Sequence, residues 1–499
     1  MTPANELGTA TPLSSSLTNA QVFGHPRGLM TLFFTEMWER ATYYGMRAIL
    51  ILFMTTLIAE GGLGMDDRTA NSIYGLYISA TYLLSLWGGW VADRLIGQQR
   101  AVMFGGLLIM FGNALLVVSD TRFFFVGLTL IVFGTGLLKP NISAVVAQLY
   151  PEGGARRDAG FSIFYMGINV GSFFGQLLVP IAAVAWGWKM GFAVPAIGML
   201  LGLVQFWFGR KYLNGAGEQI SGERGQWWPV YGLVALVALL IIAAFQGWME
   251  LEPTAIARGA NWAMIALAAG YFLYLLFFAG LDNNERGKVI VMIALFTGCA
   301  MFWAGFEQAG ASFTLFAERY TDRNLFGWEI PGGAVQSANA IFIIIFAPIF
   351  AALWVWLGKR NLNPSAPAKF ALGLIFMGLG FLVMVGAANY VIAGQKVLPT
   401  WLALTYLLHT FGELCLSPVG LSSMTKLAPA RFVGQVMGVW FLATAIGNNL
   451  AGQFSGEIDP NNLATMPELY THLFWWGAIA GLVMLAITPW MRRLIKDSK

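Results

Sequence analysis

Four ionisable side chains and two tyrosines lie close together near the start of the sequence: Glu36, Glu39, Arg40, Tyr43, Tyr44 and Arg47. The segment around them, residues 29–58, is otherwise largely apolar. In a helix, four of the six side chains fall on one stripe about 16 Å long, namely Glu36, Arg40, Tyr44 and Arg47. An internal ion-pair ladder that fixes helix packing would explain this stripe. We favour a polar pathway, because ionisable groups buried in a membrane usually line routes for protons and charged ligands.

Three more charged residues lie inside other apolar segments: Lys139, Glu307 and Glu413. Pro140 follows the lysine and allows its helix to bend there, because proline removes a backbone hydrogen bond. A lysine near a helix end can extend its ammonium group to the lipid headgroups, but Lys139 lies too far from either end of its segment. We therefore expect the buried cations and carboxylates to compensate one another within a shared cavity.

Glu413 has polar neighbours one helical turn away on either side. Ser417 follows it by four residues and His409 precedes it by four, so both share a helix face with it. His409 could accept a proton, but we favour a packed or interfacial histidine. The sequence has no recognisable zinc motif or nucleophile elbow, so an intramembrane enzyme lacks support.

Glycines recur at every fourth residue in the apolar segment 160–185, at Gly167, Gly171 and Gly175. This spacing places them on one helix face and predicts close packing against a neighbouring helix. Asn169 lies among them. Its buried amide needs hydrogen-bond partners, so it is either a packing contact or a substrate ligand.

The elements that position these residues are predicted to be membrane-spanning helices. Of 499 residues, 57% are hydrophobic and 11% are charged, whereas a soluble domain has about 25% charged residues. This composition excludes a cytosolic enzyme, a disordered chain and a disulfide scaffold. No segment alternates as a membrane β-barrel requires. We predict an all-α polytopic protein whose spans, at roughly 20 residues each, lie near 29–58, 70–93, 101–119, 123–149, 160–185, 190–213, 229–247, 261–281, 288–317, 334–357, 369–389, 399–427, 435–455 and 470–491.

The distribution of basic residues between the loops predicts the orientation. Fourteen spans place both termini on one side, and nineteen Lys and Arg residues lie on that side against seven on the other. Positive charge accumulates in cytoplasmic loops, so we expect both termini in the cytoplasm. The basic residues are scattered over many short loops, which gives no reason to expect nucleic-acid binding.

The fourteen spans divide into two blocks of six, separated by two spans without intramembrane charge. This pattern predicts two bundles around a central cavity with an inserted hairpin at the edge. The predicted divisions are a cytoplasmic tail, an N-terminal six-helix bundle, a linker with two extra helices and a C-terminal six-helix bundle, at residues 1–27, 28–213, 214–286 and 287–499.

Several motifs together resemble one transporter family. Glu-x-x-Glu-Arg at 36–40 is followed by Tyr43-Tyr44-Gly45, and FYMGINVGSFFG occupies 164–175. Further matches are Gly89-x-x-Ala92-Asp93-Arg94, Lys139-Pro140, FWAGFEQ around Glu307, QSAN ending at Asn339, and ELCLSPVG from Glu413. In their order and positions these motifs resemble the proton-dependent oligopeptide transporter family of the major facilitator superfamily. The resemblance covers nearly the whole chain.

The resemblance implies roles for individual residues. Proton coupling would involve Glu36, Glu39, Arg40 and Glu307. The peptide carboxylate would be attracted by Arg40 and Lys139, helped by Tyr44 and Tyr82. The peptide ammonium group would be held by Glu413, with Asn169, Asn339 and Ser417 nearby. Trp440 would line a side-chain pocket.

Two pairs of charges are expected to act as gates. Arg47 and Glu307 would form the outer gate, with Arg47 also counted among the substrate-binding residues. Lys139 and Glu413 would face each other across the cavity, and without a peptide we expect the cations to pair with Glu413 through contact or water.

One departure from the family pattern is Ala41, where a phenylalanine commonly follows the arginine of the first motif. Thr81 and Tyr82 stand where animal members have a histidine, so histidine-based coupling is not expected.

The function implied is proton-coupled import of di- and tripeptides by alternating access, in a bacterial cytoplasmic membrane. The expected partners are peptides, protons and membrane lipid, with no cofactor, no metal and a functional monomer. A same-family carrier of nitrate or another small anion is the alternative, since it would use the cations without needing an ammonium site at Glu413.

Overall fold

The chain is almost entirely helical. The computed structural model describes residues 21–22, 24–118, 120–152, 154–218, 226–248, 252–325 and 327–496. Each of the fourteen predicted spans corresponds to one long helix in this part of the chain: α2 (Arg27–Thr55), α3 (Asp67–Val91), α4 (Gln98–Leu116), α5 (Thr121–Gln148), α6 (Gly154–Trp186), α7 (Trp188–Gly209), α8 (Trp228–Phe245), α9 (Pro253–Leu273), α10 (Asn283–Phe306), α12 (Ser337–Lys359), α13 (Ala366–Ile392), α14 (Thr400–Leu427), α15 (Val433–Ser455) and α16 (Thr465–Lys496).

Length and hydropathy support a polytopic membrane protein. Eleven stretches of described helix are long and apolar enough to cross a membrane. The helices outside this set are α2, α3 and α15. Helix α2 carries the buried charges Glu36, Glu39, Arg40 and Arg47, which explains why hydropathy alone does not select it.

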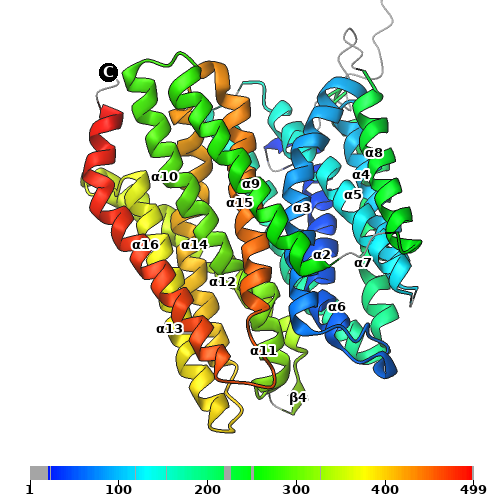
Figure 1. Ribbon diagram of the computed structural model, residues 1–499. Helices are drawn as coiled ribbons and strands as arrows, with labels where there is room; N and C mark the ends of the chain where they lie inside the picture. Colours follow the sequence, from blue (N-terminus) through cyan, green and yellow to red (C-terminus); the bar gives the residue numbers. More distant parts are fainter. Residues whose placement is uncertain are drawn as a thin grey trace, which may run out of the picture.

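The helices are arranged in two groups that lie side by side. Figure 1 shows α2–α7 in one group and α10–α16 in the other. The largest apolar core joins buried side chains from Met264 to Met491, whereas two other cores lie mainly within the first group. This arrangement agrees with the expected pair of bundles. The boundaries given above for the four divisions stay a prediction.

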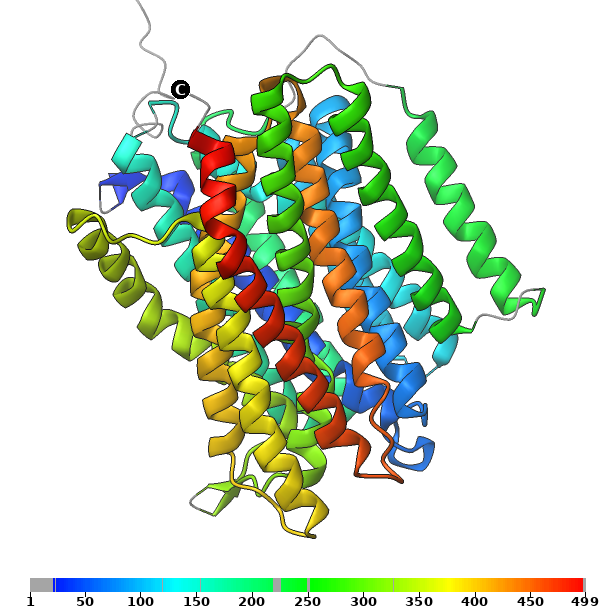
Figure 2. The same cartoon turned by 60° about the vertical axis from the view of Figure 1, so that its left-hand side comes forward.

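The two helices between the groups differ in their packing. Helix α9 lies across the junction, where the Asn449 side chain of α15 donates a hydrogen bond to the Ala257 carbonyl and the Ser79 hydroxyl of α3 faces the Met264 sulfur. Helix α8 has no buried residue and stands apart at the edge of the molecule (Figure 2). Of these two helices, therefore, only α9 packs against both groups.

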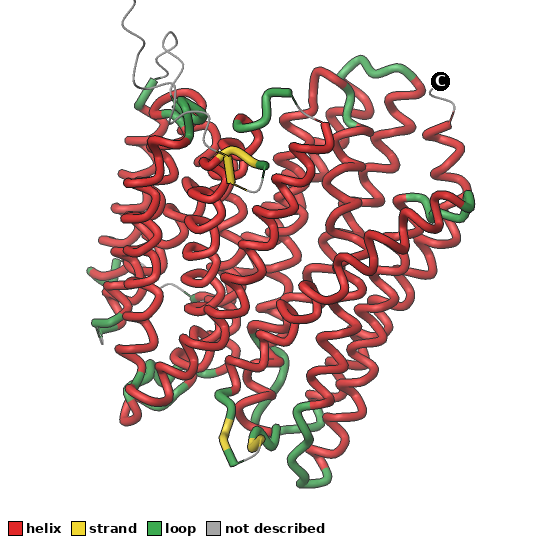
Figure 3. The backbone as a smooth tube through the Cα atoms, turned by 180° about the vertical axis from the view of Figure 1, so that it is seen from behind, coloured by secondary structure: helices red, strands yellow, loops and turns green. Residues whose placement is uncertain are grey.

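The first and last described elements lie at one end of the molecule. The hairpin of β1 (Gln21–Val22) and β2 (His25–Pro26) and the end of α16 lie at this end, which we call the terminal face. A second hairpin, of β3 (Asn324–Leu325) and β4 (Trp328–Glu329), lies at the other end, which we call the opposite face (Figure 3).

The predicted continuous span 288–317 is wrong in one respect, because the structure breaks it. Helix α10 ends at Phe306, a 3-10 turn covers Glu307–Gly310, and α11 (Ser312–Tyr320) follows. Gly310 lies so close to the Tyr74 hydroxyl that any side chain there would collide with it. The break places Glu307 at the end of a helix within the protein interior, rather than in the middle of a regular span.

The glycine stripe has the packing role that its spacing predicts. A Cβ atom at Gly171 would lie 2.2 Å from the Met37 carbonyl oxygen, and one at Gly175 would lie 2.2 Å from the Ala41 carbonyl oxygen. Both carbonyls belong to α2. Helices α2 and α6 therefore touch through their backbones, which fixes the charged helix against its neighbour.

We expect Gly171→Val to lower the midpoint of thermal unfolding of the purified protein, because the new side chain cannot enter the α2–α6 contact without separating the helices. Overpacking of this kind costs about 1–3 kcal/mol or more. The matched control is Gly270→Val in α9, where an added Cβ would meet no atom within 4 Å. Equal effects of the two substitutions would contradict the close-packing interpretation.

Candidate functional site

A central cavity lies between the two groups of helices and brings together most of the predicted residues. Its volume is about 110 Å³. The first group contributes Tyr44, Arg47, Tyr82 and Asn169, and the second contributes Glu307, Asn339 and Glu413. Residues from distant parts of the sequence thus form one polar site. Glu36, Glu39, Arg40, Lys139, Ser417 and Trp440 do not line this cavity in the structure.

The predicted contact between Arg47 and Glu307 is present. The Arg47 Nη2 atom lies 2.6 Å from Glu307 Oε2, and both side chains are buried. Arg47 also donates from Nε to the Tyr74 hydroxyl at 2.5 Å. This pair joins α2 of the first group to the break after α10 in the second. Its two charges compensate each other in the interior.

Tyr74 is a site residue that the sequence reasoning missed. It lies on α3 and is fully buried, so its hydroxyl depends on the Arg47 guanidinium for a polar partner. A tyrosine in an apolar segment gives no local signal of this role. The contact exists because α3 packs beside α2, and the absence of a side chain at Gly310 leaves room for it.

Arg40 lies between two carboxylates of its own helix. Its Nε atom is 2.9 Å from Glu36 Oε1 and also contacts Glu39. All three side chains are buried. If both carboxylates are ionised, the cluster has an excess negative charge, which is costly in an apolar interior. One proton bound to either carboxylate would remove this excess.

Lys139 lies beside the cavity and contacts a residue that lines it. Its ammonium nitrogen is 3.8 Å from the centroid of the Tyr82 ring, in a cation–π contact. Among the residues that the structure describes, no carboxylate forms an ion pair with Lys139. The cation is therefore available to an anionic group that enters the site next to Tyr82.

Glu413 lies on the other side of the cavity, on α14. Its Oε2 atom accepts a hydrogen bond from Asn339 Nδ2 at 3.4 Å, and the same amide donates to the Thr410 hydroxyl at 2.9 Å. Within the described part of the chain, Glu413 contacts neither Lys139 nor Arg40 in an ion pair. Lys139 and Glu413, which were expected to act as a gate, are therefore not in contact in this structure.

Three other predicted residues have clear surroundings. The Asn169 amide donates to the Tyr165 carbonyl of its own helix while also lining the cavity. The Ser417 hydroxyl is buried, and no described residue hydrogen-bonds to it. Trp440 packs against Phe370, with ring centroids 6.1 Å apart, and covers Gly420. Trp440 therefore lies in the core of the second group rather than in the wall of this cavity.

His409 is packed as the sequence analysis favours. Its Nε2 atom lies 3.1 Å from the Met377 carbonyl oxygen, and the rings of Phe306, Phe313 and Phe381 surround the imidazole. It contacts no carboxylate among the described residues. This environment is that of a core histidine, although His409 also lines the cavity.

Contacts between the two groups close the cavity toward the opposite face. The Arg319 guanidinium of α11 donates to both carboxylate oxygens of Asp67 at the start of α3, at 2.5 and 2.8 Å. Gly75 and Gly452 let α3 and α15 meet, because a Cβ at Gly452 would lie 2.3 Å from the Asn71 carbonyl oxygen. Asp67 and Arg319 lie near predicted span ends far apart in the chain, so nothing in the sequence indicates that they pair.

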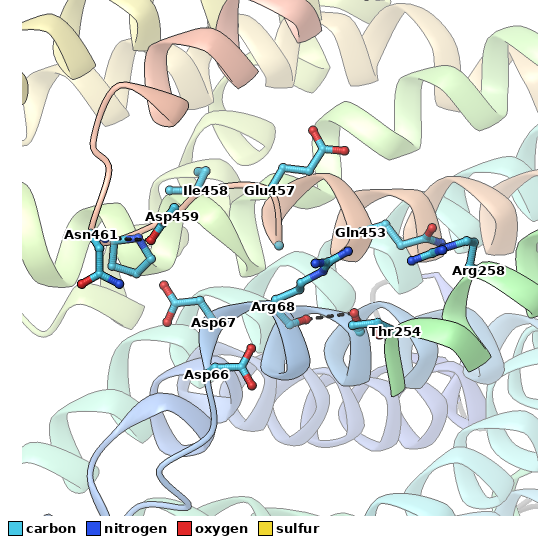
Figure 4. Close-up of a pocket in the computed structure, with 13 residues that line it drawn as sticks. Asp66, Asp67, Arg68, Thr254, Arg258, Gln453, Glu457, Ile458, Asp459 and Asn461 are labelled. Atoms are coloured by element: carbon cyan, nitrogen blue, oxygen red, sulfur yellow. Dashed lines mark hydrogen bonds between the residues drawn. The ribbon is translucent and has the colours of Figure 1, made fainter. Parts of the chain in front are cut away.

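A larger cavity of about 690 Å³ lies beyond this closure, near the opposite face. Figure 4 shows its wall, formed by the start of α3, the start of α9 and the loop after α15, with Arg68, Arg258, Glu457 and Asp459 among the labelled side chains. None of the predicted site residues lines it. The smaller central cavity is therefore the candidate site. No group of three or more side chains suited to a metal ion occurs in the described residues.

Comparison with known proteins gives matches over nearly the whole chain. The family model described as "POT family" matches residues 99–464. The peptide transporter YePEPT of Yersinia enterocolitica is 40% identical over 495 residues, covering 96% of each chain. A di-/tripeptide transporter of Lactococcus lactis is 36% identical over 497 residues, covering 96% of this chain and 98% of its own. A crystal structure of a mutant peptide transporter, POT, in complex with alafosfalin is 40% identical, with a TM-score of 0.88 and coverage of 97% and 98%.

We expect the buried pair of Arg47 and Glu307 to stabilise the fold measurably. Arg47→Glu or Glu307→Arg alone leaves like charges in contact, and breaking a buried ion pair costs about 3–5 kcal/mol. The double exchange should recover part of this loss, as measured by thermal unfolding of the four proteins.

The control is the pair of Arg156 and Glu152, whose side chains are 42% and 46% exposed. The same exchange there should change stability by less than about 1 kcal/mol. If the Arg47→Glu and Glu307→Arg losses simply add in the double variant, the two charges do not stabilise each other directly.

Proposed function

Because the chain belongs to the POT family, we propose that it is a proton-coupled symporter that imports di- and tripeptides by alternating access. The observation that supports this proposal most strongly is the separation of charges around the central cavity. Arg40 and Lys139 belong to the first group of helices, and Glu413 belongs to the second. A peptide with free termini has complementary charges at its two ends.

We infer that the peptide lies across the junction between the two groups. Its carboxylate is directed toward Lys139 and Arg40, and its ammonium group toward Glu413 and Asn339. Tyr44 and Tyr82 line the cavity on the carboxylate side, and Asn169 offers an amide in the same wall. Ser417 is proposed as a further polar contact near Glu413. Because both termini are fixed, the peptide side chains can vary.

Proton coupling is proposed to depend on the cluster of Glu36, Glu39 and Arg40. One guanidinium compensates one of the two carboxylates, so a proton taken up by the cluster neutralises the remaining charge. A peptide carboxylate that approaches Arg40 competes with the same carboxylates. Protonation of the cluster would release the guanidinium for this contact, which links proton uptake to peptide binding.

The pair of Arg47 and Glu307 is proposed as the gate toward the opposite face. Protonation of Glu307 would remove its charge and weaken the contact with Arg47, which favours opening at that face. Lys139 and Glu413 are proposed to approach each other at another stage of the cycle, since they lie apart here. In this proposal, the structure corresponds to the stage in which the contacts that close the cavity toward the opposite face are formed.

We propose that the terminal face is cytoplasmic, because basic residues are concentrated in the loops on that side. The membrane is then the bacterial cytoplasmic membrane, and the opposite face is external. A monomer contains both halves of the site. No cofactor is needed in this proposal, because the proton gradient supplies the driving force.

Two observations favour peptides over nitrate. The relatives reported above are described as peptide or di-/tripeptide transporters. Glu413 also places a carboxylate in the cavity wall, where it would repel a small anion and attract an ammonium group.

We expect Glu36→Gln, Glu39→Gln and Arg40→Ala each to abolish uptake of a dipeptide driven by a proton gradient, while the proteins stay folded. Each substitution removes one member of the proposed proton-binding cluster. Exchange of peptide without a gradient should partly survive in the two glutamine variants. Glu152→Gln, in an exposed ion pair, is the control and should transport normally. Full gradient-driven accumulation in all three variants would rule out the coupling role.

Peptides with blocked ends test the proposed orientation. Glu413→Gln should weaken binding of a free dipeptide more than binding of its N-acetylated form, because acetylation already removes the ammonium charge. Lys139→Ala should weaken binding of the free dipeptide more than that of the amidated form. Binding constants of the three ligands for each variant give the comparison. Equal losses for free and blocked ligands in both variants would show that these residues act on gating or proton transfer.

A further inference from the structure

A separate cavity opens at the terminal face, between the start of α2 and the end of α7. Its volume is about 270 Å³. The polar end of its wall includes Arg27, Lys211 and Tyr212, and the apolar part includes Met30, Phe34 and Phe208. The mechanism proposed above uses none of these residues.

The polar end of this cavity has an excess of positive charge. The Arg27 guanidinium carbon lies 4.0 Å from the centroid of the Tyr212 ring, and the Lys211 ammonium nitrogen lies 5.2 Å from the same centroid. Arg210 adjoins them, stacked on Trp207 at 3.7 Å. Among the described residues, no acidic side chain lines the cavity.

These cations also lack acidic partners elsewhere in the described chain. The ion pairs among the described residues include neither Arg27, Arg210 nor Lys211. Two like charges that share one aromatic ring repel each other, and an anion placed between them would be attracted by both.

The apolar part of the wall indicates what kind of anion fits. Of the aromatic side chains that line it, Phe34 is 42% exposed and Phe208 is 67% exposed. Phe34 lies two helical turns from Arg27, about 10 Å along the axis of α2. The cavity therefore passes from a cationic end at the membrane surface to aromatic side chains that face hydrocarbon. A free inorganic anion would not bury this apolar surface, whereas the acyl chain of a lipid would.

We propose that this cavity binds an anionic phospholipid, with the headgroup phosphate between Arg27 and Lys211 and an acyl chain along Phe34 and Phe208. Basic pockets at the ends of membrane helices suit such headgroups because charge attraction and burial of the chain act together. This proposal goes beyond the transport function and does not depend on it.

The test measures lipid binding to the full-length protein in detergent by native mass spectrometry, with phosphatidylglycerol and phosphatidylethanolamine of identical acyl chains. The test variant is Arg27→Gln with Lys211→Gln. The matched control is Lys359→Gln with Arg360→Gln, which removes the same charge from the end of α12, where Arg360 stacks on Trp356 at 4.0 Å. A charge-conserving variant, Arg27→Lys with Lys211→Arg, keeps both positive charges and tests whether charge alone is sufficient for lipid binding.

We expect the unaltered protein and the α12 control to retain phosphatidylglycerol in preference to phosphatidylethanolamine. The Arg27 and Lys211 glutamine variant should lose about thirtyfold in phosphatidylglycerol affinity, while the charge-conserving variant should keep most of it. Phe208→Ala should weaken retention of both lipids, because it removes part of the apolar wall.

Three results would overturn the proposal. Equal losses in the test and control variants would show a general effect of positive charge. Competition by millimolar inorganic phosphate that abolishes the preference would assign the site to a free anion. No preference in the unaltered protein would also contradict it. If the double glutamine variant does not fold, Lys211→Gln alone and the charge-conserving variant distinguish the same outcomes.

Discussion

Ionised side chains in the interior of a membrane protein need counter-charges within the protein, and this constraint organises the central part of the molecule. Arg40 lies between Glu36 and Glu39, and Arg47 pairs with Glu307. In the Arg40 cluster, one of the two carboxylates has no cation of its own and can bind a proton. In the Arg47–Glu307 pair, protonation of the carboxylate can separate the two side chains. The same electrostatics that permits burial therefore also makes the site responsive to protons and charged peptides.

The rest of the architecture positions these charges and allows their contacts to change. Glycines on α6 hold α2 in backbone contact, Tyr44 and Arg47 of α2 line the cavity, and the break after Phe306 brings Glu307 within reach of Arg47. The closure toward the opposite face includes the packing of α3 on α15 at Gly75 and polar contacts such as Arg319 with Asp67. A closure formed between two largely separate cores can be broken and re-formed.

The sequence was sufficient to predict the fourteen helices and the three charged residues that line the cavity, because hydropathy is a local property and a charge in an apolar segment is conspicuous. Contacts between segments that are distant in the chain are harder to predict from the sequence. Nothing near Tyr74 or Asp67 indicates their partners. Trp440 lies in a core instead of the cavity wall, and Tyr74 packs against Gly310 at the break after α10. These features arise from tertiary packing, which residue spacing within one helix does not determine. The pairing of Arg47 with Glu307 was anticipated only through the family resemblance.

The central claim is that peptide and proton cross the membrane together through this one charged cavity. Its most direct test is simultaneous measurement of dipeptide uptake and internal pH in proteoliposomes that contain no other transporter. With an inward proton gradient, the account predicts dipeptide accumulation above the external concentration, and with a dipeptide gradient alone it predicts acidification of the interior. Dipeptide entry that only equalises the two concentrations and leaves the internal pH unchanged would contradict it.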